Sequence, residues 1–150
     1  MKVQSKIKNN NPFELFFSDI ILNKNESLIK KISNLDKGLL EIYSPSESLA
    51  FITSTISRIR NEGVILIVDT PELSRSLYED CSEFLGNYVN VIHVPEIDTH
   101  PMSGLEFGSF SNIERNGSIS KILDLKNKNF LAITSGLSLA QKTPKLEFLA

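Results

Sequence analysis

The sequence predicts an α/β fold in which a parallel sheet is flanked by helices. Four short runs rich in β-branched and aromatic residues are spaced too widely along the chain for hairpins. In the segments between them, apolar residues recur every three or four positions, which is typical of amphipathic helices. Strands that alternate with helices form parallel sheets with right-handed crossovers. The four predicted strands are Leu39 to Tyr43, Val64 to Val68, Val89 to Val94 and Phe130 to Thr134.

Helices are expected between these strands and before the first of them. Thr70, Pro71 and Glu72 supply an N-cap, a proline in the first helical position and an acid in the first turn. Ser44 or Ser46 is expected to cap the preceding helix. The expected apolar faces are Phe13, Phe16, Phe17, Ile20 and Ile21; Leu28, Ile32 and Leu35; Leu49, Ile52, Ile56 and Ile59; and Leu73, Leu77, Cys81, Phe84 and Leu85.

A long loop is expected over 95–111, which holds two prolines and two glycines and has little periodicity. A helix over Asn112 to Lys126 should follow it, with Gly117 as an unfavourable interior residue. Residues 1–11 are polar and aperiodic, so they are interpreted as a flexible leader. The remaining 12–150 suit one domain, because a chain of 150 residues buries about 70% of its unfolded surface.

The composition excludes several classes of protein. With 16 basic and 18 acidic side chains the net charge is −2, so no overall positive field attracts nucleic acid. No aromatic residues interleave with the lysines that could form a local patch. One cysteine cannot form an internal disulfide, and no signal peptide or membrane span is visible, which favours the cytoplasm. The lysines considered for a local nucleic-acid patch are Lys2, Lys6, Lys8, Lys126 and Lys128.

In parallel sheets, ligands bind beyond the carboxyl ends of the strands, so those loops are the candidate sites. The loop after the first predicted strand occupies the place of a phosphate-binding loop. It lacks glycine and lysine, and it carries a proline without an N–H donor and an acid that would repel phosphate. Nucleotide binding in the usual mode is therefore disfavoured. The loop residues are Ser44, Pro45, Ser46, Glu47 and Ser48.

Acidic residues follow two of the other strands. Asp69 resembles a metal ligand or a ribose-binding acid, but no partner motif precedes it, and a helix-starting acid is the favoured interpretation. Glu96, Asp98 and His100 resemble a metal or acid–base cluster, although their spacing fits no established ligand pattern. No metal site is predicted.

Two further residues are interpreted as structural. His93 lies within an apolar strand and is expected to make a hydrogen bond rather than bind metal. Cys81 lies on the apolar face of its helix, and nothing near it in the sequence would lower its pKa, so it is expected in the core.

Several phrases in sequence order resemble the N-terminal module of bacterial transcription-repair coupling factors (the Mfd family), which is itself similar to the first domain of excinuclease B. Arg115 stands in the place of a recurrent arginine of that family. The resemblance departs from the family at Ser44 to Glu47, at Ile97, at His100 and at Gly117. The phrases are GLLEIYSPSESLAFITSTI, VILIVDTPELSRSLYEDCSEFLG, VNVIHVPEIDTHP, SNIERNGSISKILDL and FLAITSGLSLAQKTP.

The resemblance implies a RecA-like domain, related to P-loop NTPases, with a degenerate phosphate loop. It implies a non-catalytic scaffold without a cofactor, belonging to a larger ATP- and magnesium-dependent DNA translocase that acts in transcription-coupled nucleotide excision repair. The implied partners of the whole protein are excinuclease A and RNA polymerase, and DNA through downstream motor domains. The implied roles of the module are support of excinuclease A recruitment and autoinhibition. Its candidate interaction residues are Asp69, Glu96, Asp98, His100 and Arg115.

Two other interpretations stay open. The chain could be a small nucleotide-dependent enzyme domain that uses Asp69 with Glu96 and Asp98. It could also be the first domain of an excinuclease B or helicase relative, although the intact phosphate-binding motif of such proteins is absent.

Overall fold

The computed structural model describes residues 26–34, 38–97, 110–125, 128–141 and 143. The chain divides into two compact units, Met1–Tyr43 and Ser44–Ala150, whose positions relative to one another are not determined. The predicted leader lies outside the described residues, and the predicted single domain over 12–150 stays a prediction.

The first unit contains helix α3 (Glu26–Ser33). Lys30 and Lys31 lie in its last turn, where positive charge interacts favourably with the helix dipole. Ile32 is buried, as its periodicity predicts. The helix predicted around Phe13 to Ile21 lies outside the described residues.

The predicted strand Leu39 to Tyr43 is wrong, because this segment forms no strand in the structure. Leu39 is 83% exposed and Tyr43 is 91% exposed. A strand is stable only when a neighbour accepts and donates its backbone hydrogen bonds. No described segment pairs with these residues, so their strand-like composition is not sufficient to form one.

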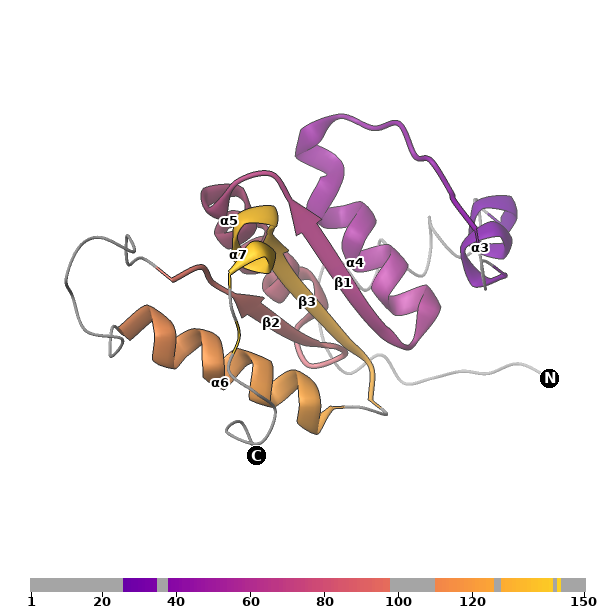
Figure 1. Ribbon diagram of the computed structural model, residues 1–150. Coiled ribbons are helices and arrows are strands. Elements are labelled where there is room, and N and C mark those ends of the chain that lie inside the picture. Colours follow the sequence, from indigo (N-terminus) through magenta and orange to yellow (C-terminus); the bar gives the residue numbers. More distant parts are fainter. Residues whose placement is uncertain (1–25, 35–37, 98–109, 126–127, 142, 144–150) are drawn as a thin grey trace. The chain divides into compact units, whose positions relative to one another are not determined.

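The second unit is built on a three-stranded, fully parallel sheet, and the three arrows in Figure 1 point the same way. The strand order is β1-β3-β2, so the last strand in sequence lies at the centre. The sheet confirms the α/β class and three of the four predicted strands. The strands are β1 (Gly63–Val68), β2 (Asn90–Val94) and β3 (Phe130–Ser135).

A helix follows each strand, and the helix after β1 begins and ends at residues suited to those positions. The side chain of Thr70 accepts a hydrogen bond from the N–H of Leu73 at 3.2 Å, which confirms the predicted cap. Gly86 ends the same helix with a positive φ of 50°, which favours glycine. The helices of this unit are η2 (Ser46–Ser48), α4 (Leu49–Arg60), α5 (Pro71–Leu85), α6 (Phe110–Asp124) and α7 (Gly136–Ala140).

The start and the buried face of α4 differ from the sequence prediction. Ser48 occupies the N-cap position after a 3-10 turn, so neither Ser44 nor Ser46 caps the helix. The predicted apolar residues of α4 are only half-buried, whereas a stripe of small residues is buried. Small side chains let α4 lie close to α5, and the Cys81 thiol is 3.6 Å from the carbonyl oxygen of Ala50. This stripe is Ala50, Thr53, Ser54, Thr55 and Ser57.

The two faces of the sheet are covered unequally. Residues that lie side by side on neighbouring strands point to the same face of the sheet. His93 lies in one row with Leu66 and Ile133, and its contact with Ser74 shows that this row faces α5. The next row, with Ile65, Ala132 and Ile92, therefore points to the opposite face. Ala132 and Ile92 are buried there, and α6 packs against β2, but Ile65 is 59% exposed. The β1 side of this face is open among the described residues.

None of the helices in the described ranges is long and apolar enough to cross a bilayer.

Candidate functional site at the carboxyl ends of the strands

The segment that leaves β2, Val94 to Ile97, is held by side chains from three other elements. We call this group of side chains the exit clamp. It consists of Arg115 on α6, Thr134 on β3, Ser138 on α7 and Gln141 just after α7.

Arg115 forms the centre of the exit clamp. Its side chain is only 2% exposed. Nη1 donates to the carbonyl oxygen of Pro95 at 2.9 Å and to the hydroxyl of Ser138, and Nη2 donates to the carbonyl oxygen of Ser138 at 2.8 Å. Burial lowers the pKa of Arg115, but a guanidinium stays protonated in proteins. Hydrogen bonds from a charged donor to neutral acceptors therefore join α6, α7 and the end of β2.

Two hydroxyls complete the grip on Val94 and Pro95. The Ser138 Oγ lies 3.2 Å from the Val94 carbonyl oxygen and 3.1 Å from that of Pro95, and it donates its single proton between them. Thr134 Oγ1 donates to the Val94 carbonyl oxygen at 3.0 Å. Ser138 is placed by Ser135, whose hydroxyl accepts from the Ser138 N–H at 3.0 Å and so caps α7.

The side-chain amide of Gln141 bonds to both backbone polar groups of Ile97, the last residue of this segment that the structure describes. Its Oε1 accepts from the Ile97 N–H at 2.7 Å, and its Nε2 donates to the Ile97 carbonyl oxygen at 3.1 Å. A primary amide used in this way replaces a neighbouring strand, because it offers one donor and one acceptor. The backbone is thus fixed as far as Ile97.

The chemistry available to the exit clamp is binding and positioning. Two of the guanidinium nitrogens of Arg115 already donate to oxygens within the protein, and its Nε is buried without a hydrogen-bond partner. Thr134 and Ser138 are both buried, so neither hydroxyl is presented to a substrate. The exit clamp holds the protein's own backbone.

The structure separates the other candidates predicted from the sequence. Asp69 is exposed at the end of β1, and Glu96 is half-buried beside the exit clamp. Because β3 lies between β1 and β2, the ends of these two strands are two strand spacings apart, about 10 Å. Asp69 and Glu96 are therefore not brought together as one acid–base site. Asp98 and His100 lie outside the described residues.

The loop at the start of α4 is an exposed turn. Ser44 to Glu47 are exposed, and the 3-10 turn Ser46–Ser48 leads directly into the helix. The hydroxyl of Ser48 donates to the carbonyl oxygen of Pro45 at 2.7 Å, within the same turn. Of the predicted lysines, Lys128 is exposed, and Lys2, Lys6, Lys8 and Lys126 lie outside the described residues.

Sequence reasoning identified Arg115 as a candidate for a surface contact and missed Ser138 and Gln141. The burial of Arg115 leaves it no surface to offer a partner in this conformation. A signal for Ser138 is present in the sequence, since Ser135 and Ser138 have the spacing of an N-cap and its N3 residue. No local pattern marks Gln141, because its partner lies 44 residues away.

A second group of polar side chains lies on the face of the sheet that α5 covers. His93 Nε2 is 3.1 Å from Ser74 Oγ, which confirms the expected hydrogen bond, and the His93 ring stacks on Tyr78 with centroids 5.6 Å apart. Ser74 is only 1% exposed, so this serine is not accessible as a nucleophile. Cys81 is fully buried, as predicted, and burial raises the pKa of its thiol.

Acid is expected to destabilise the protein through His93. Burial lowers the pKa of His93; the charge of Arg75 on α5 acts in the same direction, and the carboxylates of Glu114 on α6 and Glu79 on α5 oppose it more weakly. The unfolded chain then binds a proton more readily than the folded one, so the free energy of unfolding falls as the pH drops below about 6.5. Urea unfolding at pH 7.5 and pH 5.5 should show a smaller loss in His93→Gln than in the wild type. Equal losses in the two proteins would contradict this assignment.

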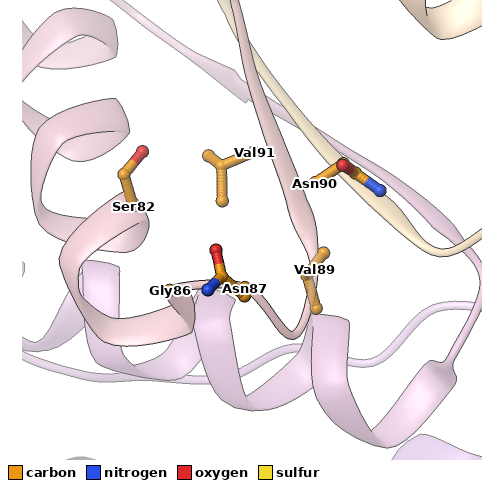
Figure 2. A pocket seen from close by; sticks show the side chains of 6 residues that line it. All are labelled: Ser82, Gly86, Asn87, Val89, Asn90 and Val91. Carbon is orange, nitrogen blue, oxygen red and sulfur yellow. The ribbon is translucent and has the colours of Figure 1, made fainter. Parts of the chain in front are cut away.

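A shallow pocket lies at the opposite, amino-terminal end of β2 (Figure 2). Its volume is about 230 Å³, below the roughly 300–1,000 Å³ of small-molecule sites. It is far from the strand ends at which ligands of parallel sheets bind. It is lined by Ser82, Gly86, Asn87, Val89, Asn90 and Val91.

In the described part of the chain, no group of three histidine, cysteine or acidic side chains is placed to hold a metal ion. The fold defines a small α/β protein with a parallel sheet and a buried polar clamp at its carboxyl edge. Comparisons of the chain with models of protein families, with curated proteins and with solved structures gave no match.

Proposed function

We propose that the chain is a non-catalytic, protein-binding module similar to the N-terminal part of bacterial transcription-repair coupling factors. In this proposal it acts in the cytoplasm as part of a larger motor protein. It supports recruitment of excinuclease A and restrains the motor in the resting enzyme. ATP, magnesium and DNA are bound by other domains, and RNA polymerase is a partner of the whole protein.

The observation that carries the proposal is the exit clamp. At the carboxyl ends of the strands, the arginine and the buried hydroxyls bind the protein's own backbone. This arrangement suits a rigid scaffold better than a reactive site. The positions of Asp69 and Glu96 at the ends of two strands that are not neighbours support the scaffold over the enzyme alternative, in which Asp69 acts with Glu96 and Asp98.

The resemblance adds support from the order of the elements. Phrases that resemble the family coincide with β1 and α5, with α6, and with β3 and α7. A parallel sheet with this helix content is compatible with part of a RecA-like domain.

The size and partners of the native product test the coupling-factor proposal. An antibody raised against this chain should detect, in the source cell, a product on the order of a thousand residues. After ultraviolet damage, that product should co-precipitate with excinuclease A and with RNA polymerase. A product near 16.8 kDa that binds neither would overturn the proposal.

Nucleotide titration of the isolated chain separates the scaffold from the enzyme alternative. A ligand present at 100 times its dissociation constant stabilises a protein by about 2.7 kcal/mol. We expect millimolar ATP with magnesium to leave the thermal midpoint unchanged. A rise that Asp69→Ala abolishes and the neighbouring control Glu72→Ala retains would instead establish a nucleotide site and contradict the scaffold function.

A further inference from the structure

Strand β1 is an edge strand without the features that normally keep such edges unpaired. It pairs only with β3 among the described residues, so the hydrogen-bonding groups of its other edge face no described strand. Natural edge strands are protected by charge, proline or a bulge. Gly63–Val68 contains no charged residue and no proline.

The open edge is continuous with an exposed apolar face. Ile65 is 59% exposed and Ile67 is 55% exposed, and alternation along the strand points both to the same side of the sheet. The other edge strand, β2, differs, since it carries Asn90 and His93 and packs against α6. Of the two edge strands among the described residues, β1 is therefore the one with an uncharged, open edge.

The sequence of β1 indicates which partner fits this surface. Val64, Ile65, Leu66, Ile67 and Val68 read the same in both directions. Two antiparallel copies related by a two-fold axis through Leu66 would place Ile65 opposite Ile67 and Val64 opposite Val68. Directly opposite β-branched residues stabilise antiparallel pairs, and a two-fold interface requires such self-complementarity.

We propose that β1 is a self-association edge, through which two copies of this chain join their sheets into one six-stranded sheet. The pairing aligns Ile65 with Ile67 of the second copy on the open face. Charge does not oppose it strongly, because Glu62 beside the strand is already paired with Arg60 of its own chain. This proposal is independent of the function proposed above.

Sedimentation equilibrium of the full chain from about 1 to 200 µM tests the association. We expect the mass to rise from 16.8 kDa to twice that value and then stop, because a two-fold interface closes. Ile67→Lys should raise the dissociation constant at least about tenfold, since a lysine would lie against apolar residues. The control Ile113→Lys, at a 66% exposed position on α6, should dimerise as the wild type does.

Cysteine cross-linking tests the register. A mixture of tagged Ile65→Cys and untagged Ile67→Cys should form a disulfide rapidly, because opposite Cβ atoms lie about 4.5–5.5 Å apart. Ile65→Cys alone should cross-link slowly, because its own copy sits on a diagonal about 7–8 Å away. Buried Cys81 leaves the readout clear. A monomer at every concentration, growth beyond a dimer, or equal cross-linking in both samples would overturn the proposal.

Discussion

Replacing Arg115 with leucine is expected to lower the free energy of unfolding by about 2–4 kcal/mol. The substitution removes the guanidinium donors to the Pro95 and Ser138 carbonyl oxygens, which then keep, among the described residues, only the Ser138 hydroxyl and the Gln141 N–H as donors. A hydrogen bond to a charged group contributes about 1.5–3 kcal/mol, and leucine cannot supply the hydrogen bonds that are lost. Urea unfolding at pH 7.5 measures the loss.

Arg115→Lys is the graded control for this prediction. An ammonium keeps the positive charge but lacks the planar fork that reaches two oxygens at once, so an intermediate loss is expected. The Ile97 N–H donates a hydrogen bond to Gln141 Oε1, and its hydrogen exchange should accelerate in both variants as the exit clamp loosens. A leucine variant as stable as the wild type would show that the exit clamp contributes nothing to stability.

Replacing Gly63 with alanine is expected to destabilise the protein by about 1–3 kcal/mol. A Cβ at this position would lie 2.5 Å from Cε1 and 2.7 Å from Cζ of the Phe130 ring, which occupies that space on the neighbouring strand. The half-buried ring must shift to make room for the added methyl group. Thermal or urea unfolding measures the effect.

The matched control is Gly117→Ala. Gly117 lies inside α6, and no atom lies within 4 Å of an added Cβ. Alanine there should stabilise the protein by about 0.5–1 kcal/mol, because it restricts the unfolded chain more than glycine does. Combining Gly63→Ala with Phe130→Leu should recover part of the loss. Equal effects of the two alanine substitutions would contradict the steric explanation.

Local pattern was sufficient for the elements whose stability is local or whose neighbours are present. The β-branched run at β1 and the Thr70 cap of α5 were both predictable, because strand composition and capping act over a few residues. Leu39 to Tyr43 has an equally suitable composition, yet it forms no strand. Pairing depends on a partner that composition does not specify.

The candidate site was less predictable than the fold. Arg115 was identified through a resemblance, but its role depends on oxygens contributed by residues 20 and 23 positions away. The α4 face was misassigned because periodicity marks large apolar residues, while contact with α5 selected small ones such as Ser54 and Ser57. Long-range packing decided both cases, and a single sequence carries little information about it.

The central position of β3 has a consequence for synthesis of the protein. Both β1 and β2 pair with β3 and not with each other, and β3 is the last of the three strands to be made. A nascent chain released only as far as α6 therefore holds two strands with no shared neighbour, and the sheet assembles only once Ser135 has left the ribosome. Until then β1 lacks a partner on both of its edges, including the one that β3 later covers, so translation is an interval in which this chain is prone to aggregate.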